Sequence, residues 1–313
     1  FLLVCSYLCC MNVPHRPYYD FSTFLRKFFN GKVQKISIHA GFTCPNRDGK
    51  LSKEGCLYCN NKTFTPFYTD EKISITNQLL TGTEFYSRRY NCEYFFAYFQ
   101  TYSGTYAPIE ILEEKYKEAL EFPLIKGIII ATRPDCINMS VIDLLSKLKE
   151  KTYVRIEIGV ESFYDNVLNS INRCHDSETA IKAIKLLSDV NIDTSVHLIF
   201  GLPNESIKAA KDYARILSNT NAKFVKLHHL QIVKGSRLAE IYANNNNFVK
   251  LYNLNNYIET LAEFLSYLRN DIYVERFINR VPKEMLIAPK FGDINENKFT
   301  QLLCEYMCKN SLF

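Results

Sequence analysis

The sequence predicts an α/β fold, in particular a partial (β/α)6 barrel with a small C-terminal α/β extension. Six short apolar segments alternate with amphipathic segments of helical periodicity, which implies strands that pair in parallel. Several of these strands carry polar residues on one face. Three cysteines follow the first strand directly, and the loops after barrel strands are where active sites form.

The predicted strands cover residues 33–39, 94–100, 127–132, 154–160, 194–200 and 224–230. In the fourth strand, side chains alternate between an apolar and a polar face: Ile156, Ile158 and Val160 against Arg155, Glu157, Gly159 and Glu161. Parallel strands covered by helices on both faces should be apolar on both. The repeated polar stripe therefore favours an open barrel with a ligand-lined lumen over a doubly wound sheet. For any single polar residue, a strand end satisfied by a loop is an equally good interpretation.

Helical periodicity covers residues 108–121, 140–151 and 176–190 between these strands. The first begins with Pro108, the second has Ser140 and Asp143 spaced as a capping box, and the third starts at Asp176.

The pattern changes after residue 236, with helices expected at 236–248, 251–269 and 297–310 and mixed strand and turn pieces between the last two. We therefore divide the chain into an N-terminal leader and helix (1–29), a core (30–235) and a C-terminal extension (236–313). The extension is expected to cap the open side of the barrel.

The composition is that of an ordinary globular protein of 313 residues with a net charge of +5. Its eleven cysteines are odd in number and too sparse for a disulfide scaffold, which predicts a reducing, cytoplasmic location. Residues 1–10 are apolar but too short to span a bilayer, and we interpret them as extra or fragmentary sequence rather than native. No other apolar run reaches membrane length, so no membrane partner is expected.

Cys44, Cys56 and Cys59 are the most informative residues of the chain. They form a CxxC pair with one thiol upstream and no fourth thiol nearby. Structural zinc sites use four protein ligands. An iron–sulfur cluster held by three thiolates leaves one iron open to another ligand. The spacing thus predicts a metal site with one open position.

Six stretches in family order, between about residues 33 and 242, carry a resemblance to a known family: KISIHAGFTCPNRDG…GCLYCNN, YFQTYSGTYAP, ATRPDCI, IEIGVESFYDNVLNSINRCHD, HLIFGLPNES and VKLHHLQIVKGSRLAEIY. The chain resembles the radical S-adenosylmethionine (SAM) superfamily. More narrowly it looks like the YhcC-like subfamily, which is related to the radical SAM domain of the Elongator catalytic subunit.

The resemblance implies a radical SAM enzyme with a TIM-barrel-like fold. Cys44, Cys56 and Cys59 would hold an oxygen-sensitive [4Fe–4S] cluster whose open iron binds SAM. Reductive cleavage of SAM would yield a 5′-deoxyadenosyl radical that abstracts a substrate hydrogen. A reductant such as flavodoxin or ferredoxin would supply the electron. Neither the residue that acts on the substrate nor the substrate itself follows from the motifs.

The resemblance also implies residues that contact SAM. Ser103, Gly104 and Thr105 would lie against its methionyl end, where glycine allows close backbone approach. Glu157 or Glu161 would accept bonds from the ribose hydroxyls. Arg173 would meet the carboxylate, and Gly201 would belong to the turn beside the adenine. Related enzymes often have Gln in place of Glu161. A pairing of Glu157 with Arg155, and a plain turn at Gly201, are the simpler interpretations.

The main alternative is a non-catalytic interaction or RNA-binding module in which His39 completes a Cys₃His zinc site. His228 and His229 point to opposite strand faces, so at most one of them faces the lumen. Cys304 and Cys308 are interpreted as small buried hydrophobes rather than a second metal site. Within the enzyme class, tRNA and a small anionic metabolite are both open as substrates, the latter because Lys226, Arg155 and histidines are expected to line the lumen.

Overall fold

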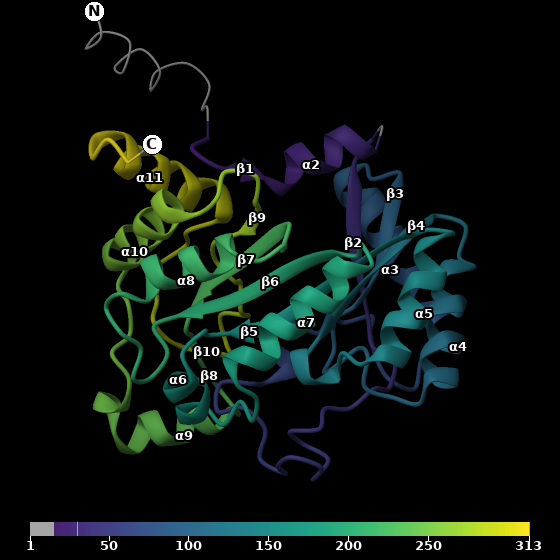
Figure 1. Ribbon diagram of the computed structural model, residues 1–313, viewed down its shortest axis with the longest axis horizontal. Coiled ribbons are helices and arrows are strands. Elements are labelled where there is room, and N and C mark those ends of the chain that lie inside the picture. Colours follow the sequence, from purple (N-terminus) through teal and green to yellow (C-terminus); the bar gives the residue numbers. More distant parts are fainter. Residues whose placement is uncertain (1–15, 30, 313) are drawn as a thin grey trace, which may run out of the picture.

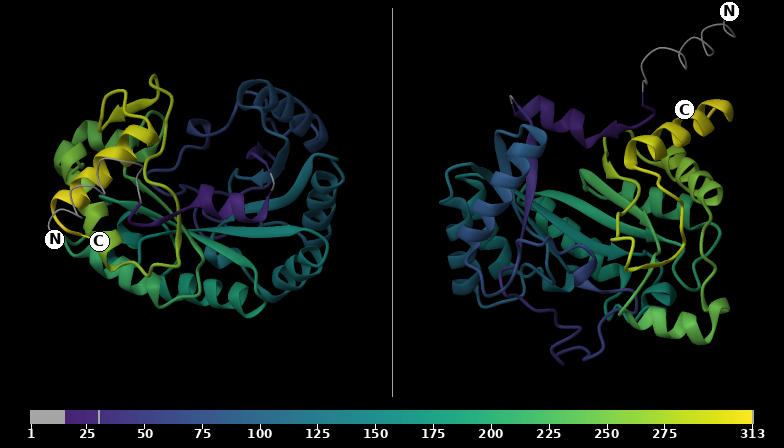
Figure 2. Two further views of the ribbon diagram at one scale, coloured as in Figure 1. Left: turned by 90° about the horizontal axis from the view of Figure 1, so that it is seen from above. Right: turned by 180° about the vertical axis from the view of Figure 1, so that it is seen from behind.

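Eight parallel strands form one curved sheet whose order is β1-β9-β7-β6-β5-β4-β3-β2. This is seen in a computed structural model that describes residues 16–29 and 31–312 (Figure 1). The sheet bends into an incomplete ring with helices on its outer side, and its two edge strands, β1 and β2, do not pair (Figure 2). Residues 1–10, which we interpreted as extra or fragmentary sequence, lie outside the described residues.

All six predicted barrel strands are present, so the predicted partial (β/α)6 barrel is confirmed. They are β2 (Val33–Ile38), β3 (Tyr94–Phe99), β4 (Ile125–Thr132), β5 (Tyr153–Glu161), β6 (Asp193–Phe200) and β7 (Phe224–His229). Two further strands extend the sheet beyond β7. β9 (Tyr273–Arg276) lies in the stretch that was expected to hold strand and turn pieces, whereas the short β1 (Tyr19–Asp20) was not expected.

The alternation along the strands divides the sheet into two faces, as predicted. The apolar face packs under the helices in the main core, with Ile36, Phe99, Ile156, Ile158, Val196 and Leu227 all at most 1% exposed. The polar face lines the lumen. Because the apolar set is buried against helices on one side only, the polar set is free to line a cavity.

The helices of the core are α3 (Ile75–Tyr90), α4 (Ile109–Leu120), α5 (Met139–Lys149), α6 (Asp165–Ser170), α7 (Ser177–Asp189) and α8 (Ala209–Ser218). The 3-10 turns η1 (Asn61–Thr63) and η2 (Pro134–Cys136) follow β2 and β4. Asp176 caps α7 as predicted, by accepting a hydrogen bond from the N–H of Thr179 (2.8 Å).

Two expectations about the helices are wrong or incomplete. The capping residue of α5 is Asn138, which accepts from the N–H of Val141 (3.0 Å), and not Ser140, which already lies inside the helix. The helix α3 was not expected, because Thr, Asn and Gly in its sequence favour helix weakly. It forms because one face, with Ile75 and Leu79, is buried against β2.

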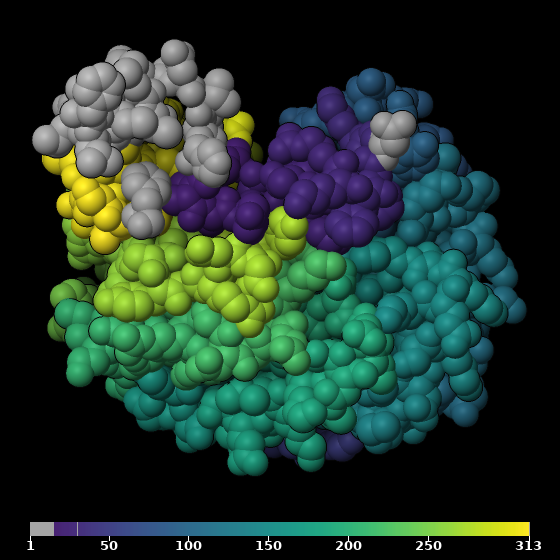
Figure 3. Space-filling model, turned by 45° about the horizontal axis from the view of Figure 1, so that its top comes forward, coloured from purple at the N-terminus to yellow at the C-terminus, as the bar shows by residue number. Residues whose placement is uncertain are grey.

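The helix α2 (Phe21–Phe28) closes the amino-terminal end of the barrel, opposite the cysteine loop. The purple residues of β1 and α2 lie across this end in Figure 3. Phe24 packs edge-on against Phe224 of β7 (4.8 Å between ring centroids), and the buried guanidinium of Arg155 lies over Phe21 (4.5 Å to the centroid). Aromatic rings therefore cover the base of the lumen, and the cavity extends from there toward the carboxyl ends of the strands.

The C-terminal residues form α9 (Arg237–Asn244), η3 (Asn246–Phe248), α10 (Leu254–Tyr267), β10 (Leu286–Ala288) and α11 (Glu296–Lys309), while β8 (Ile232–Val233) pairs with β10 in an antiparallel hairpin. The three helices expected here are confirmed, and α10 packs on α8 and α11. Cys304 and Cys308 are both only half-buried on α11.

The C-terminal extension is joined to the barrel sheet. Through β9 it adds a strand to the sheet, and Arg276 and Asn279 belong to the cavity wall. None of the helices in the described part of the chain combines the length and apolar composition needed to cross a membrane.

Candidate active site

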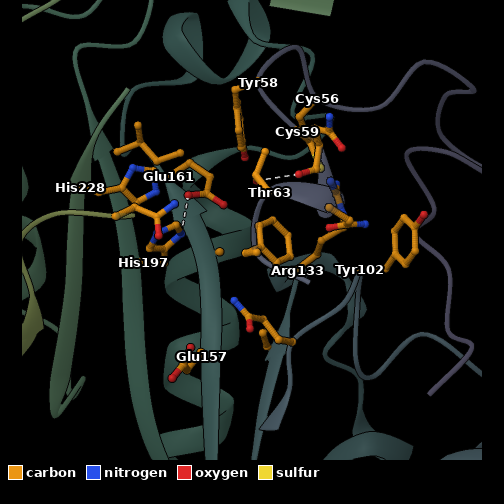
Figure 4. A pocket seen from close by; sticks show the side chains of 18 of the residues that line it. Cys56, Tyr58, Cys59, Thr63, Tyr102, Arg133, Glu157, Glu161, His197 and His228 are labelled. Carbon is orange, nitrogen blue, oxygen red and sulfur yellow. Dashed lines mark hydrogen bonds and ion pairs between the residues drawn. The ribbon is translucent and has the colours of Figure 1, made fainter. Parts of the chain in front are cut away.

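The three predicted ligands, Cys44, Cys56 and Cys59, line one cavity at the carboxyl ends of the strands (Figure 4). Its empty volume is about 1210 Å³ and it opens to solvent. The loop that carries them folds back on itself through the N–H of Arg47, which donates to the carbonyl of Cys44 (2.8 Å), and through the N–H of Cys59, which donates to that of Cys56 (3.0 Å). The fold of the loop thus places all three cysteines on one wall of the cavity.

This loop is fastened to the segment that follows α6. The N–H of Leu57 donates to the carbonyl of Ile171 (3.0 Å), and the Asn46 amide donates to the carbonyl of Asn172 (2.6 Å). The Asn172 amide donates in return to the carbonyl of Gly55 (2.8 Å). Reciprocal bonds of this kind hold a long irregular loop in one position, as a metal-binding loop requires.

The sulfur of Cys56 receives two N–H groups, from Asn46 Nδ2 (3.4 Å) and Arg173 Nη1 (3.5 Å). Such donors stabilise negative charge on a thiolate and tune the clusters that thiolates bind. Burial raises the pKa of Cys59 to about 11, with a further contribution from Cys56, so metal binding must displace a proton there. Within residues 16–29 and 31–312, no three His, Cys, Asp or Glu side chains are arranged to hold a metal ion.

Arg173 joins the cysteine loop to the end of β5. Its Nη2 lies 3.4 Å from Glu161 Oε1 and also donates to the carbonyl of Gly159, while its Nε donates to His175 Nε2 (3.0 Å). A Cβ at Gly159 would lie 2.6 Å from Arg173 Nη2, so only glycine lets the guanidinium approach the strand. All three guanidinium nitrogens of Arg173 are thus engaged within the protein.

Glu161 is held in an unusual way. Its φ of 69° is in the left-handed region, where the strand pairing with β6 shifts register. Backbone strain at a non-glycine residue is concentrated at functional sites. Its Oε2 lies 2.9 Å from His197 Nδ1. Burial would raise the pKa of Glu161, but His197 and Arg173 outweigh it and lower the pKa to about 2, so the carboxylate is charged at neutral pH.

Glu157 lies on the same strand but deeper, and Figure 4 shows it well away from the cysteines. Its Oε1 accepts from Lys35 (2.5 Å) and Arg155 (3.2 Å), and its Oε2 accepts from Tyr98 (2.6 Å) and Lys226 (2.8 Å). Four donors fill the four lone pairs of a carboxylate.

Glu157 therefore has no acceptor left for a ribose hydroxyl. The contacts of Glu157 fit the simpler interpretation, in which it pairs with Arg155 across a polar interior. We call this set of buried ion pairs, which Glu275 joins through Lys35 (2.7 Å) and Arg155 (3.3 Å), the base network. Its members are Lys35, Tyr98, Arg155, Glu157, Lys226 and Glu275.

Ser103, Gly104, Thr105 and Gly201 do not line the cavity. The hydroxyls of Ser103 and Thr105 both bond to Thr132 Oγ1 (2.9 and 2.6 Å), behind the cavity wall. A Cβ at Gly104 would lie 2.7 Å from Ile130, so the glycine serves close packing against β4. The N–H of Gly201 donates to Glu205 (2.6 Å). These contacts show that the four residues support the cavity wall from behind. They do not support the predicted direct contacts with SAM.

Several cavity residues were not singled out from the sequence. They share buried polar atoms that have no hydrogen-bond partner in the described chain: Arg133 Nη1, Gln231 Oε1 and Arg276 Nε, together with His197 Nε2. Unsatisfied buried groups are rare in native proteins and call for an explanation such as a ligand. Arg133 directly follows β4, and that strand-end position is the signal that could have identified it.

We call the ionisable groups at the open end the mouth cluster: Arg133, Glu161, Arg173 and His197. His39, the proposed fourth zinc ligand, is not part of the cavity wall. Its Nδ1 accepts from the N–H of Gly41 (3.2 Å).

Fold and site together define the class: a parallel half-barrel protein with a cysteine loop after its first barrel strand. The family model for the radical SAM superfamily matches residues 44–217, and a radical SAM C-terminal domain model matches residues 222–308. The chain belongs to the radical SAM superfamily.

Individual relatives agree with this assignment. The chain is 31% identical over 281 residues to the protein YhcC of Escherichia coli K12, a match that covers 89% of this chain and 88% of that one. It is 27% identical over 186 residues to a tRNA uridine(34) acetyltransferase of Methanocaldococcus infernus, which covers 58% of this chain and 33% of that one. The structure of Elp3 from the same archaeon aligns with a TM-score of 0.65 at 21% identity, covering 90% of this chain and 64% of that one.

Proposed function

We propose that this protein is a radical SAM enzyme whose [4Fe–4S] cluster is held by Cys44, Cys56 and Cys59. The observation that carries the proposal is that these three thiols line one cavity together with buried polar groups that lack partners. Thiolates are the ligands of iron–sulfur clusters, and three of them leave one iron for SAM. When bound, the cluster and SAM supply the one-electron cleavage that generates a 5′-deoxyadenosyl radical for hydrogen abstraction.

The protein's contribution at the cysteine loop is electrostatic and positional. Asn46 and Arg173 donate to the Cys56 sulfur and so stabilise charge on the thiolate. Their own positions are fixed, because Asn46 is bonded to the carbonyl of Asn172 and Arg173 to that of Gly159. The thiolate is therefore presented to a cluster from a rigid support.

The mouth cluster supplies groups that suit the polar ends of SAM. Arg133 is 2% exposed and uses Nε and Nη2 on Asp135 (2.8 and 2.9 Å), which leaves Nη1 without an acceptor. A free guanidinium N–H in a cavity wall matches a carboxylate. We assign the SAM carboxylate to Arg133, since the nitrogens of Arg173 are already engaged.

Glu161 is the acceptor that we assign to the ribose hydroxyls. Its two oxygens have one ionic partner each, Arg173 and His197, so each keeps a lone pair for a hydroxyl donor. The low pKa of this carboxyl, about 2, keeps it an acceptor at any physiological pH.

The substrate is a tRNA or a small anionic metabolite, and the electron comes from a reductant such as flavodoxin or ferredoxin. Support for tRNA comes only from the relative named as a tRNA uridine(34) acetyltransferase, which this chain matches over a third of that protein's length. Support for an anionic metabolite comes from the cations of the lumen, which are developed below.

The test is anaerobic purification followed by iron analysis and SAM cleavage under reduction. The wild-type protein should be brown and carry about four irons per chain, with broad absorbance from thiolate–iron bonds. It should convert SAM to 5′-deoxyadenosine. The triple variant Cys44→Ala, Cys56→Ala, Cys59→Ala should lose iron and cleavage together.

Cys92→Ala is the matched control, because Cys92 is a buried free cysteine that precedes β3, at the opposite end of the barrel from the loop. It should retain both properties. A colourless wild-type protein with one zinc would refute the proposal and favour the Cys₃His module. Full iron content in the triple variant would refute the assignment of the ligands.

A further inference from the structure

The base of the lumen carries more positive than negative charge. Two carboxylates, Glu157 and Glu275, are surrounded there by four cationic side chains: Lys35, Arg155, Lys226 and Arg276. With all six groups charged, the surplus is two positive charges. A surplus of positive charge among partly buried groups is stabilised by an added anion.

Arg276 is the cation without a partner. It makes no hydrogen bond or ion pair within the described residues, and its Nε is buried without an acceptor. An irregularity in the pairing of β7 with β9 places Arg276 opposite Lys226, while Glu275, the residue before it, bonds to Lys35 in the base network. Bulges are a known way to re-aim a side chain next to an active site. The strand irregularity thus brings a second cation beside Lys226.

Lys226 also has unused capacity. Its side chain is 10% exposed, and two of its three N–H donors go to Glu157 (2.8 Å) and Tyr98 (3.0 Å). Burial lowers the pKa of Lys226 to about 8; Glu157 opposes this, whereas Arg276 and Lys35 add to it. The ammonium is therefore mostly protonated at pH 7 and would gain from an added negative charge.

Acceptors lie on the same wall, nearer the mouth. His228 Nδ1 lies 2.8 Å from the carbonyl of His229, which can only accept, so the ring hydrogen is on Nδ1 and Nε2 is an acceptor. Gln231 donates its Nε2 to the carbonyl of Asn279 (3.1 Å) and leaves Oε1 buried and unpaired. The wall therefore offers donors at the base and acceptors above them.

We propose that Arg276 and Lys226 form a binding site for the oxyanion end, a carboxylate or a phosphate, of a small substrate that enters the lumen. His228 and Gln231 receive a hydroxyl or amino group of the same molecule. The inference rests on the proposed function in that it names the substrate class of that enzyme, and it favours a small molecule over tRNA. The covered base admits a narrow acidic terminus, whereas the phosphodiesters of a folded RNA lie along a bulky backbone.

Binding of two probes, inorganic phosphate and succinate, tests this directly. Each is titrated calorimetrically into the anaerobic, iron-loaded protein at constant ionic strength, with neutral glycerol as the reference. The wild type should bind at least one of the two anions saturably at one per chain, and glycerol not at all. The anion that binds more tightly identifies the acidic group, phosphate or carboxylate, of the substrate.

Arg276→Gln should weaken that binding about tenfold or more, which is the value of a lost charge-assisted contact. Because Arg276 has no internal partner, this change leaves the ion pairs of the base network in place. Arg276→Lys should recover part of the affinity. Arg88→Gln, on the exposed face of α3, removes the same charge far from the cavity and should bind as the wild type does.

Equal affinity in the wild type and Arg276→Gln, or no saturable binding of either anion to the wild type, would overturn the inference. Iron content is measured on the same samples. Iron present without anion binding would reject the substrate class and leave the proposed function standing. Anion binding without a cluster would reject the proposed function and leave the anion site standing.

Discussion

The base network and the mouth cluster lie in one lumen, partly on the same strand, yet their contacts differ. At the base, the Glu157 carboxylate has four donors for its four lone pairs. Arg155 has no hydrogen-bond partner for Nε and Nη1 in the described chain, but its guanidinium lies against the rings of Phe21 and Phe224 (4.5 and 4.8 Å to the ring centroids). At the mouth, Arg133 and His197 each keep a buried nitrogen without a partner. Saturated charges hold a structure together, whereas unsatisfied ones are available to a ligand.

Removal of the Glu157 charge should break the base network and give the largest effect. In Glu157→Gln, Lys35, Arg155 and Lys226 lose their shared carboxylate, and breaking buried pairs in this way costs about 3–5 kcal/mol. The free energy of unfolding, from urea titration under anaerobic conditions, should fall by that amount.

Glu161→Gln is the matched comparison four residues along the strand. It should lose clearly less stability, because Arg173 retains its bonds to Gly159, His175 and Cys56. If the two variants were equally stable, the distinction between the saturated Glu157 carboxylate and the partly unsatisfied Glu161 carboxylate would fail.

Arg133→Gln sharpens the description of the mouth. Loss of the free N–H should raise the KM for SAM by about 10–100-fold, with a much smaller change in kcat, because the carboxylate lies away from the bond that breaks. Iron content should stay at the wild-type level. Arg133→Lys keeps the positive charge but lacks the planar guanidinium, so its KM for SAM should lie between those of the wild type and Arg133→Gln. An unchanged KM with full iron content would remove Arg133 from the SAM site.

Glu205 is a third carboxyl that is largely withdrawn from solvent, and no cation of the described residues pairs with it. Its oxygens accept only from the N–H of Gly201 (2.6 Å) and the hydroxyl of Tyr213 (3.2 Å). Burial therefore raises its pKa to about 8. The folded state then binds more protons than the unfolded state between about pH 4.5 and pH 8, so this group makes stability fall as the pH rises through that window.

Glu205→Gln should abolish that contribution. Relative to the wild type, the free energy of unfolding of Glu205→Gln should be about 1–2 kcal/mol higher at pH 8 than at pH 5. This is less than the full pKa shift of Glu205 implies, because the residue is partly exposed. Unfolding of both proteins at the two pH values measures it. The same pH dependence in the variant would show that Glu205 titrates normally.

The sequence alone was enough for the barrel, because strand alternation is a local signal. The six strands end within two residues of their predicted bounds, and the lumen is polar as expected. It also placed the cysteine loop correctly at the carboxyl ends of the strands. The parts it missed depend on pairing between distant strands.

Glu157 and Glu161 illustrate this limit. They share one stripe of one strand, and no local pattern shows that Lys35 of β2 and Lys226 of β7 converge on the first and not on the second. Arg276 is a similar case, because its direction depends on an irregularity in the pairing of β9 with β7. The hydroxyls of Ser103 and Thr105, which were predicted to contact SAM, bond to Thr132 on the neighbouring strand, and no local pattern indicates that pairing. Their contacts with SAM stay a prediction.

The most direct test of the central claim is the electron paramagnetic resonance spectrum of the reduced, iron-loaded protein with and without SAM. If three cysteines hold a cluster with one open iron in this cavity, SAM should change the spectrum at saturating concentration, and Arg133→Gln should require more SAM for the same change. A four-iron cluster whose spectrum is indifferent to saturating SAM would contradict the account.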